Sequence, residues 1–334
     1  MAIQGSEATV VRALIGNGTI AALKIAAWFV SGSGAMLSEA IHTLADVGNQ
    51  ALLLIGIRQA HRTPDEKHPF GYGQAAFFWA LVSALGIFFL GCGVTVYHGI
   101  HSLSHPPENL QVGWLTWVTL TVAFFIDGWV LWGALVQVYR ERPDNMAWGE
   151  YFRRLKDPML LAVLLEDFAA CAGVVFAMIG IVVTQVTGDA TYDAIASIVI
   201  GLLLGFVAVF LVRLNQRFLI GQAVDPEIAE GIRELLEARP SIESVHAVQS
   251  RWIGPATFAY KAEVDFDGTW FAAQLEGEYK PEFTSINEPG AMGMLMRVYT
   301  EHVARLVAKE VDIVEDSIRD RFPSAGFIML EPHG

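Results

Sequence analysis

The residues of this sequence that could do chemistry are ionisable side chains set within long apolar stretches. One stretch contains His42 and Asp46, and a later stretch contains Glu166 and Asp167. If these stretches cross a lipid bilayer, a charged side chain at mid-depth costs at least about 2.5 kcal/mol, so each residue needs a specific partner or role. His42 and Asp46 are four residues apart and therefore share one face of a helix.

One imidazole and several carboxylates that converge at one depth form a site for a divalent cation. Imidazole and carboxylate together suit Zn²⁺, and they also suit Mn²⁺, Fe²⁺ and Co²⁺. The sequence therefore predicts a metal site made by His42, Asp46, Asp167 and Glu166, with Zn²⁺ as the first choice. Because Glu166 and Asp167 are adjacent, they point about 100° apart on a helix and cannot face one small site equally well.

Two other acids, Glu39 and Asp127, also lie in apolar stretches. One interpretation makes them a proton relay. The other makes them structural, with Lys24 or Asn17 as polar partners that hold helices together. The residue types leave both interpretations open.

The elements that position these residues follow from composition. Hydrophobic residues make up 53% of the 334 residues and charged residues 17%, against about 25% charged in a soluble domain. The mean hydropathy is +0.42. These values favour a polytopic α-helical membrane protein, and the net charge of −13 argues against a nucleic-acid partner. The two cysteines form no disulfide framework, and the first twenty residues do not predict a cleavable signal peptide.

Six apolar segments are long enough to cross a bilayer, which takes about 20 residues. Lys and Arg fill the second and fourth breaks between them and follow the sixth segment, and none lies in the first, third or fifth break. By the positive-inside rule, the basic breaks and both termini are cytoplasmic. The segments run at about 9–30, 35–59, 73–100, 112–138, 158–185 and 190–213.

The last third of the chain predicts a small, acidic α+β domain, with 20 acids and 10 bases from Gly221 onward. We expect a transmembrane domain at 1–217 and a cytoplasmic domain at 218–334. The expected order is helix, strand, strand, helix, strand, with a loop-rich insertion at about 268–290. The expected strands cover about Val245–Ile253, Phe258–Phe266 and Gly326–Leu330.

Enzyme chemistry has no support in the motifs. The sequence contains no HExxH, no GxSxG, no GxxxxGK[ST] and no Gly-rich nucleotide loop. Without an ATP site, transport of an ion has to use an ion gradient. We therefore expect no enzyme activity and no resident cofactor, and the divalent metal is the substrate.

Four sequence motifs resemble the cation diffusion facilitator family, the transporters of zinc and related metals. They are SGSGAMLSEAIHTLADVGNQALLLIGI, HPFGYG, DPMLLAVLLEDFAACAGV and LIGQAVDPEIAEGIRELLEARPSIESVHAVQSRWIGPATFAYKAEVDFDG. The forms SEAIHTLAD and VLLED are most similar to the zinc transporter 9 branch. The resemblance covers nearly the whole chain. It implies a homodimer, six spans with both ends inside, a ferredoxin-like cytoplasmic domain, and export of a divalent metal in exchange for protons.

The resemblance also implies a transport site of two residue pairs, each at i,i+4. His42 and Asp46 match the first pair, and Asp167 matches the second member of the other. Its first member falls at Val163, which cannot ligate a metal. Glu166 is the natural substitute.

Two secondary metal sites of the family are incomplete in this sequence. In the second break, Asp65 and His68 match ligand positions, but Tyr72 stands where a second His is expected. In the C-terminal domain His246 matches, whereas Lys261 and Met329 occupy two other ligand positions. We therefore expect no binuclear zinc cluster there.

These observations and the resemblance together predict a proton-coupled antiporter of a divalent metal, with zinc as the first choice. We expect it in the inner membrane of a prokaryote. The alternative is a metal-responsive membrane protein that binds metal and signals through its cytoplasmic domain without transport. The absent ligand at Val163 keeps this alternative open.

Overall fold

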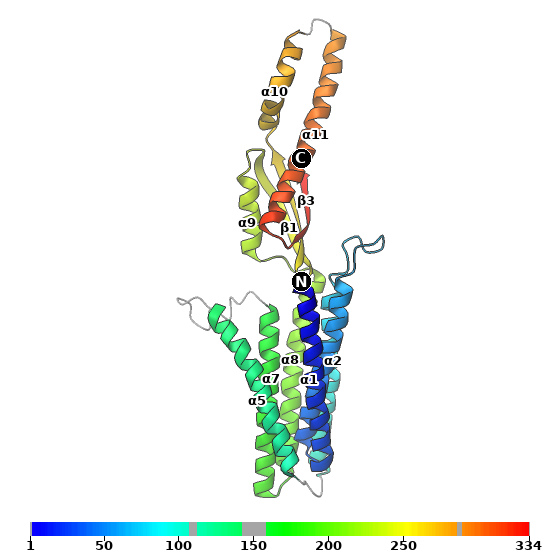
Figure 1. The fold of residues 1–334 in the computed structure, drawn as a ribbon, viewed down its shortest axis with the longest axis vertical. Coiled ribbons are helices and arrows are strands. Elements are labelled where there is room, and N and C mark those ends of the chain that lie inside the picture. The colour runs from blue at the N-terminus through cyan, green and yellow to red at the C-terminus, as the bar shows by residue number, and fades with distance from the viewer. Residues whose placement is uncertain (1, 107–111, 142–157, 286–288, 334) are drawn as a thin grey trace. The chain divides into compact units, whose positions relative to one another are not determined.

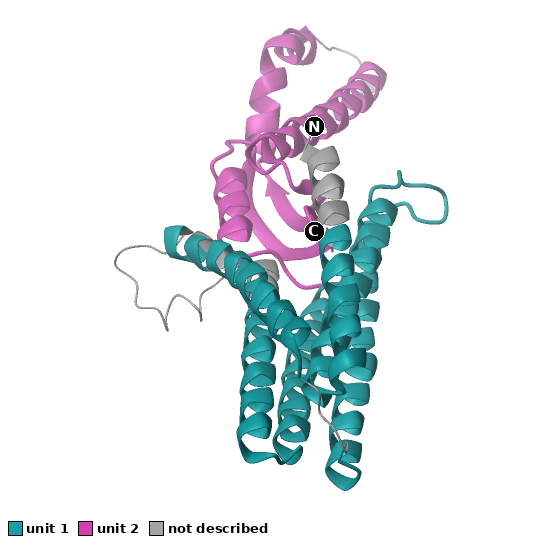
Figure 2. Cartoon of the chain, turned by 60° about the horizontal axis from the view of Figure 1, so that its bottom comes forward, with its two compact units in different colours: residues 1–219 teal, residues 220–334 magenta. Residues whose placement is uncertain are grey.

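The computed structural model describes residues 2–106, 112–141, 158–285 and 289–333. The chain divides into two compact units, Met1–Leu219 and Ile220–Gly334, drawn in teal and magenta in Figure 2.

The first unit is a bundle of helices (Figure 1). In the described residues, six helical spans are long and apolar enough to cross a membrane, which confirms the predicted polytopic class. The third span is one continuous helical rod of three parts, α3, η1 and α4, of which η1 is a π-helix. The elements are α1 (Ala2–Ser31), α2 (Gly34–Ala60), α3 (Ala75–Gly86), η1 (Ile87–Val94), α4 (Thr95–Ser104), α5 (Trp114–Glu141), α7 (Pro158–Thr187) and α8 (Thr191–Ile220).

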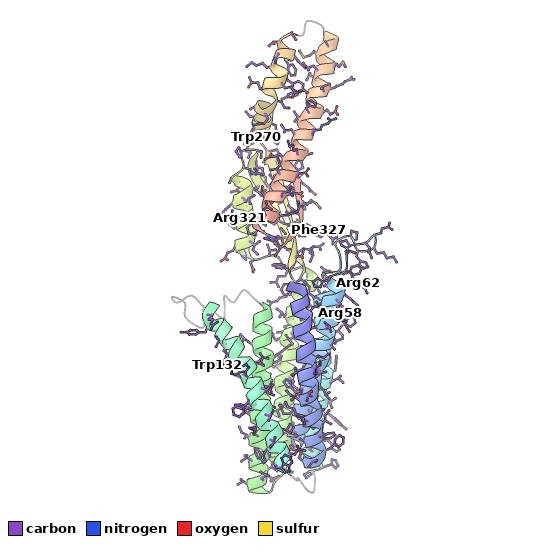
Figure 3. All side chains as sticks on the ribbon, viewed as in Figure 1. Arg58, Arg62, Trp132, Trp270, Arg321 and Phe327 are labelled. Carbon is purple, nitrogen blue, oxygen red and sulfur yellow. The ribbon has the colours of Figure 1, made fainter. Side chains whose placement is uncertain are left out.

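The outer face of the bundle is apolar. Phe29, Trp129 and Val186 are 74%, 79% and 81% exposed, and Figure 3 shows Trp132 on α5 pointing away from the other helices. Large apolar side chains are rarely exposed in such numbers unless another apolar medium covers them. The bundle therefore has the surface of a protein that lies in lipid.

Helix α8 packs closely on the third span because it carries glycines at the contact. A Cβ atom at Gly205 would lie 2.7 Å from the Sγ of Cys92 in η1, and one at Gly201 would lie 2.7 Å from a methyl of Val96. Atoms that are not bonded cannot lie this close, so any larger residue at either position would push the two helices apart. The two glycines therefore allow the close approach of α8 to the third span.

The start of α2, the helix that carries His42 and Asp46, is held by α8. The Ser33 hydroxyl oxygen accepts a hydrogen bond from the Met36 amide at 3.1 Å and so caps the helix. The buried Asp193 carboxylate of α8 accepts hydrogen bonds from the Ser33 hydroxyl and the Gly34 amide, both at 2.5 Å. A carboxylate at a helix N-terminus satisfies free amides and interacts favourably with the helix dipole.

The second unit is a three-stranded sheet covered by helices. The strand order is β1-β2-β3, with β1 and β2 antiparallel and β2 and β3 parallel. Its core is built from alternate residues of β2, including Phe258, Tyr260 and Val264, with Ile232 of α9 and Ile318 of α11. The elements are α9 (Pro226–Glu237), β1 (Ile242–Gly254), β2 (Thr257–Phe266), α10 (Gly268–Ser285), α11 (Pro289–Arg321) and β3 (Ala325–Pro332).

The expectation of a loop-rich segment at 268–290 is wrong, because residues 268–285 form helix α10. Asp267 starts this helix: its Oδ1 accepts hydrogen bonds from the amides of Thr269 and Trp270 at 2.8 and 3.2 Å. Leu275 and Tyr279 then pack against α11. The element order is therefore helix, strand, strand, helix, helix, strand.

Candidate metal site

A cavity of about 790 Å³ lies inside the first unit, between α1, α2, α5 and α7. The structure brings the four predicted ligands and one of the two other acids to its wall. Four carboxylates and one imidazole thus surround a single cavity. These residues are His42 and Asp46 from α2, Asp127 from α5, and Glu166 and Asp167 from α7. The cavity is wide enough for both Glu166 and Asp167 to line it, although these adjacent residues point in different directions.

Several buried donor atoms of the cavity wall have no hydrogen-bond partner among the described residues. His42 is 4% exposed, and neither of its ring nitrogens makes a hydrogen bond within the described part of the chain. Its Nε2 lies 3.6 Å from Oδ2 of Asp46. The buried Oδ2 of Asp167 also has no hydrogen-bond partner there. Buried polar atoms are nearly always paired, so these atoms are those a bound cation would satisfy.

The other wall residues supply further oxygen and amide donors. The amide of Asn49 approaches both carboxylate oxygens of Glu166 at 3.5 Å, and the Asn49 Oδ1 accepts a hydrogen bond from the Ser83 hydroxyl at 2.8 Å. Asn49 therefore connects α2 to α7 and α3. Asn17 and Gln50 also line the cavity. Asn49 was not among the predicted site residues, although an amide three residues after Asp46 in an apolar helix is a usable signal.

The ligands do not yet form a closed coordination sphere. Among the described residues, no group of three or more His, Cys, Asp or Glu side chains lies close enough to hold a metal ion. Val163 stands in α7 one turn before Asp167, and its side chain lies outside the described residues. Side-chain rotation or a small approach of α2 and α7 is needed before His42, Asp46 and Asp167 can share one cation.

The two other acids considered for a proton relay, Glu39 and Asp127, behave differently. Glu39 makes a buried ion pair with Lys24 of α1, with Oε2 at 2.9 Å from Nζ, which supports the helix-pairing interpretation for this residue. Asp127 lies in the cavity wall instead. A proton-relay role for either residue stays a prediction.

The segment after α2 contains Asp65, His68 and Tyr72. The Tyr72 hydroxyl donates to Oδ2 of Asp65 at 2.6 Å, and His68 Nδ1 lies 3.3 Å from Oδ1. The hydrogen bond from Tyr72, with others from His68 and Lys67, holds the pKa of Asp65 below its usual value. Tyr72 thus occupies an oxygen that a metal would need.

In the second unit, two of the three positions that match ligands of the family are paired with neighbouring acids. His246 Nε2 lies 2.9 Å from Oδ2 of Asp265, and the Lys261 ammonium lies 2.8 Å from Glu331. Met329 is 50% exposed. A β-bulge interrupts β1 directly after His246, where Ala247 has a φ of 40°. Hydrogen bonds from Ser244 and then from His246 lower the pKa of Asp265.

Comparison with known proteins decides the family. The sequence pattern of the family described as "Cation efflux transmembrane domain" matches residues 10–220 of this chain. The chain belongs to the cation efflux family. This is a family of metal-cation transporters and not of enzymes. The resemblance read from the motifs of α2 and α7 is therefore confirmed.

Similarity to individual members extends through both units. The chain is 35% identical to metal tolerance protein C4 of Arabidopsis thaliana, over 99% of this chain and 74% of that protein. It is 33% identical to the mitochondrial proton-coupled zinc antiporter SLC30A9 of Homo sapiens, over 98% of this chain. The chain spans 59% of the length of that human protein. An uncharacterized transporter of Methanocaldococcus jannaschii is 23% identical over 75% of this chain.

Proposed function

We propose that this protein is a proton-coupled antiporter that carries a divalent cation, zinc first, through the cavity between α1, α2, α5 and α7. The observation that carries the proposal is the cavity itself. It collects His42, Asp46 and Asp167 from two helices, and the ring nitrogens of His42 and Oδ2 of Asp167 are buried and make no hydrogen bond within the described residues. Buried charges of this kind in a membrane mark ion pathways.

The roles of the residues follow from their donor atoms. His42 supplies a nitrogen, and Asp46 and Asp167 supply oxygens. Glu166 provides the oxygen that Val163 cannot provide. The resulting site is richer in oxygen than in nitrogen, so Mn²⁺, Fe²⁺ and Co²⁺ are expected to compete with Zn²⁺ more strongly than at a nitrogen-rich site.

Proton coupling is supported by the same donors. Imidazole and carboxylate bind a metal in their deprotonated forms, so cation entry releases protons and proton entry releases the cation. The similar human protein is named a proton-coupled zinc antiporter. No nucleotide-binding motif is present in the sequence to supply another source of energy.

The orientation rests on basic residues at three helix ends. Arg58, Arg140 and Arg217 lie in the last turns of α2, α5 and α8. Figure 3 shows Arg58 at the end of α2 and Arg62 in the segment after it. These ends lie on the same side of a six-span topology, and basic residues favour the cytoplasm. We infer that both termini are cytoplasmic, that the cation is exported, and that the transporter works as a homodimer in a prokaryotic inner membrane.

A second function is favoured by one observation. Because no three ligands in the described residues already surround a metal position, the cavity could bind cations weakly and report their presence to the second unit without moving them. This would make the protein a metal-responsive binding protein.

Transport assays distinguish the two functions. The full-length protein in proteoliposomes, with Zn²⁺ on one side and an imposed pH gradient, is expected to show metal flux that follows the gradient. Asp46→Ala and Asp167→Ala should each abolish the flux, whereas Asp189→Ala, in the exposed segment before α8, should not. Binding without any flux would favour the second function, and full flux in both site variants would overturn the assignment of the site.

A further inference from the structure

A buried ion pair between Lys24 and Glu39 joins α1 to α2. Their side chains are 1% and 0% exposed, and the charged atoms lie 2.9 Å apart. A buried ion pair is commonly no more stabilising than two apolar side chains of the same size. The cost of each charge is higher still within a membrane. The pair therefore calls for a role besides stability.

Each residue of this pair lies close in the sequence to residues of the cavity wall. Glu39, His42 and Asp46 are separated by three and then four residues, so all three project from one face of α2. On the neighbouring helix, Ile20 and Leu23 line the cavity, and Lys24 follows them in the sequence. Glu39 is thus the next polar side chain along the face that carries the predicted ligands.

The carboxylate of Glu39 is only half used by its partner. Lys24 Nζ donates to Oε2, whereas Oε1 is buried and makes no hydrogen bond within the described residues. Helix α7, which carries Asp167, leaves room for this oxygen by having a glycine opposite it. A Cβ atom at Gly173 would overlap with Oε1. One oxygen of Glu39 therefore stands unpaired between the two helices that carry the cation ligands.

We propose that Lys24 withholds Glu39 from the transported cation and thereby lowers the affinity of the site. The inference rests on the proposed cation site. When the cation is bound, the Glu39 carboxylate can exchange between the Lys24 ammonium and the metal, since both cations attract the same carboxylate and Lys24 holds only its Oε2. Lys24 also places a fixed positive charge next to the cavity, which repels the metal. A transporter has to release its substrate, and an internal competing cation favours release.

Zinc affinity of the full-length protein in detergent tests this proposal. The measurement is competition between the protein and a chromophoric zinc chelator, for the wild type, Lys24→Met, Glu39→Gln and the double variant. Lys24→Met is expected to bind Zn²⁺ at least tenfold more tightly. In the double variant the tightening should disappear, because the released ligand is absent. Lys280→Met, which removes a surface lysine paired with Glu276, serves as the control and should leave the affinity unchanged.

The outcomes separate this proposal from the proposed function. If Asp46→Ala loses zinc binding but Lys24→Met binds no more tightly than the wild type, the role of Lys24 is wrong and the site stands. If Asp46→Ala binds zinc normally, the site itself is wrong. Lys24→Gln is a second variant in case Lys24→Met does not fold, because the glutamine amide can still donate a hydrogen bond to Glu39. It should also bind Zn²⁺ more tightly than the wild type. If both single lysine variants fail to fold and the double variant folds, the pair is purely structural and the proposal is overturned.

Discussion

Asp193 of α8 should control the stability of the helix that carries the cation ligands. Its carboxylate is 3% exposed and accepts hydrogen bonds from the Ser33 hydroxyl, the Gly34 amide and, at 3.4 Å, the Ala35 amide. The change Asp193→Ala removes both carboxylate oxygens and with them all three hydrogen bonds at the N-terminus of α2. It leaves the residues of the cavity wall untouched.

The expected loss is about 3 kcal/mol. A hydrogen bond to a charged group contributes about 1.5–3 kcal/mol, and two of the three here are short. The favourable interaction with the helix N-terminus adds up to about 2 kcal/mol in a buried setting. Relief from burying a carboxylate offsets part of this sum. For 150–250 residues, 1 kcal/mol shifts Tm by about 2–4 °C, so we expect a decrease of about 6–12 °C.

A thiol-reactive dye measures this loss in the first unit alone. Both cysteines of the chain, Cys92 and Cys171, lie in its helical spans, so dye labelling during heating follows the unfolding of that unit. Asp189→Ala is the matched control, because Asp189 is an exposed acid in the preceding segment that accepts one backbone hydrogen bond from Thr191. Equal melting of Asp193→Ala and the wild type would refute the reasoning, as would an equal decrease in the control.

Three further predictions concern the second unit and selectivity. Hydrogen bonds from Ser244 and His246 lower the folded pKa of Asp265, so its contribution to stability is present above its unfolded pKa and is lost as the pH falls through the lowered value. Urea unfolding of residues 220–334 should therefore weaken below about pH 4, less steeply in Asp265→Asn, and identical acid profiles would contradict this. The same fragment should dimerise in the presence of a chelator, and more tightly as salt screens its acidic surface; sedimentation that shows a dimer only with zinc would oppose this. Excess Mn²⁺ or Co²⁺ should inhibit zinc flux, because Val163 replaces a ligand, and strictly zinc-selective transport would exclude the oxygen-rich site.

Much of the fold could be predicted because it follows from local patterns. The spans are long apolar runs, and β2 alternates buried Phe258, Tyr260 and Val264 with polar residues. Helix α10 could not be predicted in this way because it contains Pro281 and lacks a continuous apolar period. Its stability comes from packing against α11, which is a tertiary effect. The π-helix of the third span likewise left no recognisable pattern in the sequence.

The candidate site was predictable to the extent that it depends on one helix at a time. The four-residue spacing of His42 and Asp46 fixes their common face, and their place in an apolar run fixes their depth. Contacts between helices were not predictable in the same way. Glu39 pairs with Lys24 and does not line the cavity, and this depends on how α1 packs on α2. The approach of Asn49 to Glu166 depends on the distance between α2 and α7.

The polar contacts of α2 are unevenly distributed along its length, and this bears on how the cavity opens. At its start, the Asp193 carboxylate binds Ser33 and the adjacent amide through short, buried, charged hydrogen bonds. Toward its other end, the described polar contact with α7 is that of Asn49 with Glu166 at 3.5 Å. Hydrogen bonds to a carboxylate are strong when they are short, and a contact at 3.5 Å contributes less. Separation of α2 from the helix packed on it therefore costs less at the Asn49 end, where that helix is α7, than at its start, where that helix is α8; the Asn49 end is the one that carries Arg58. In the proposed orientation this end is cytoplasmic, so we expect the cavity to admit its cation from the cytoplasm more readily than it releases it to the opposite side.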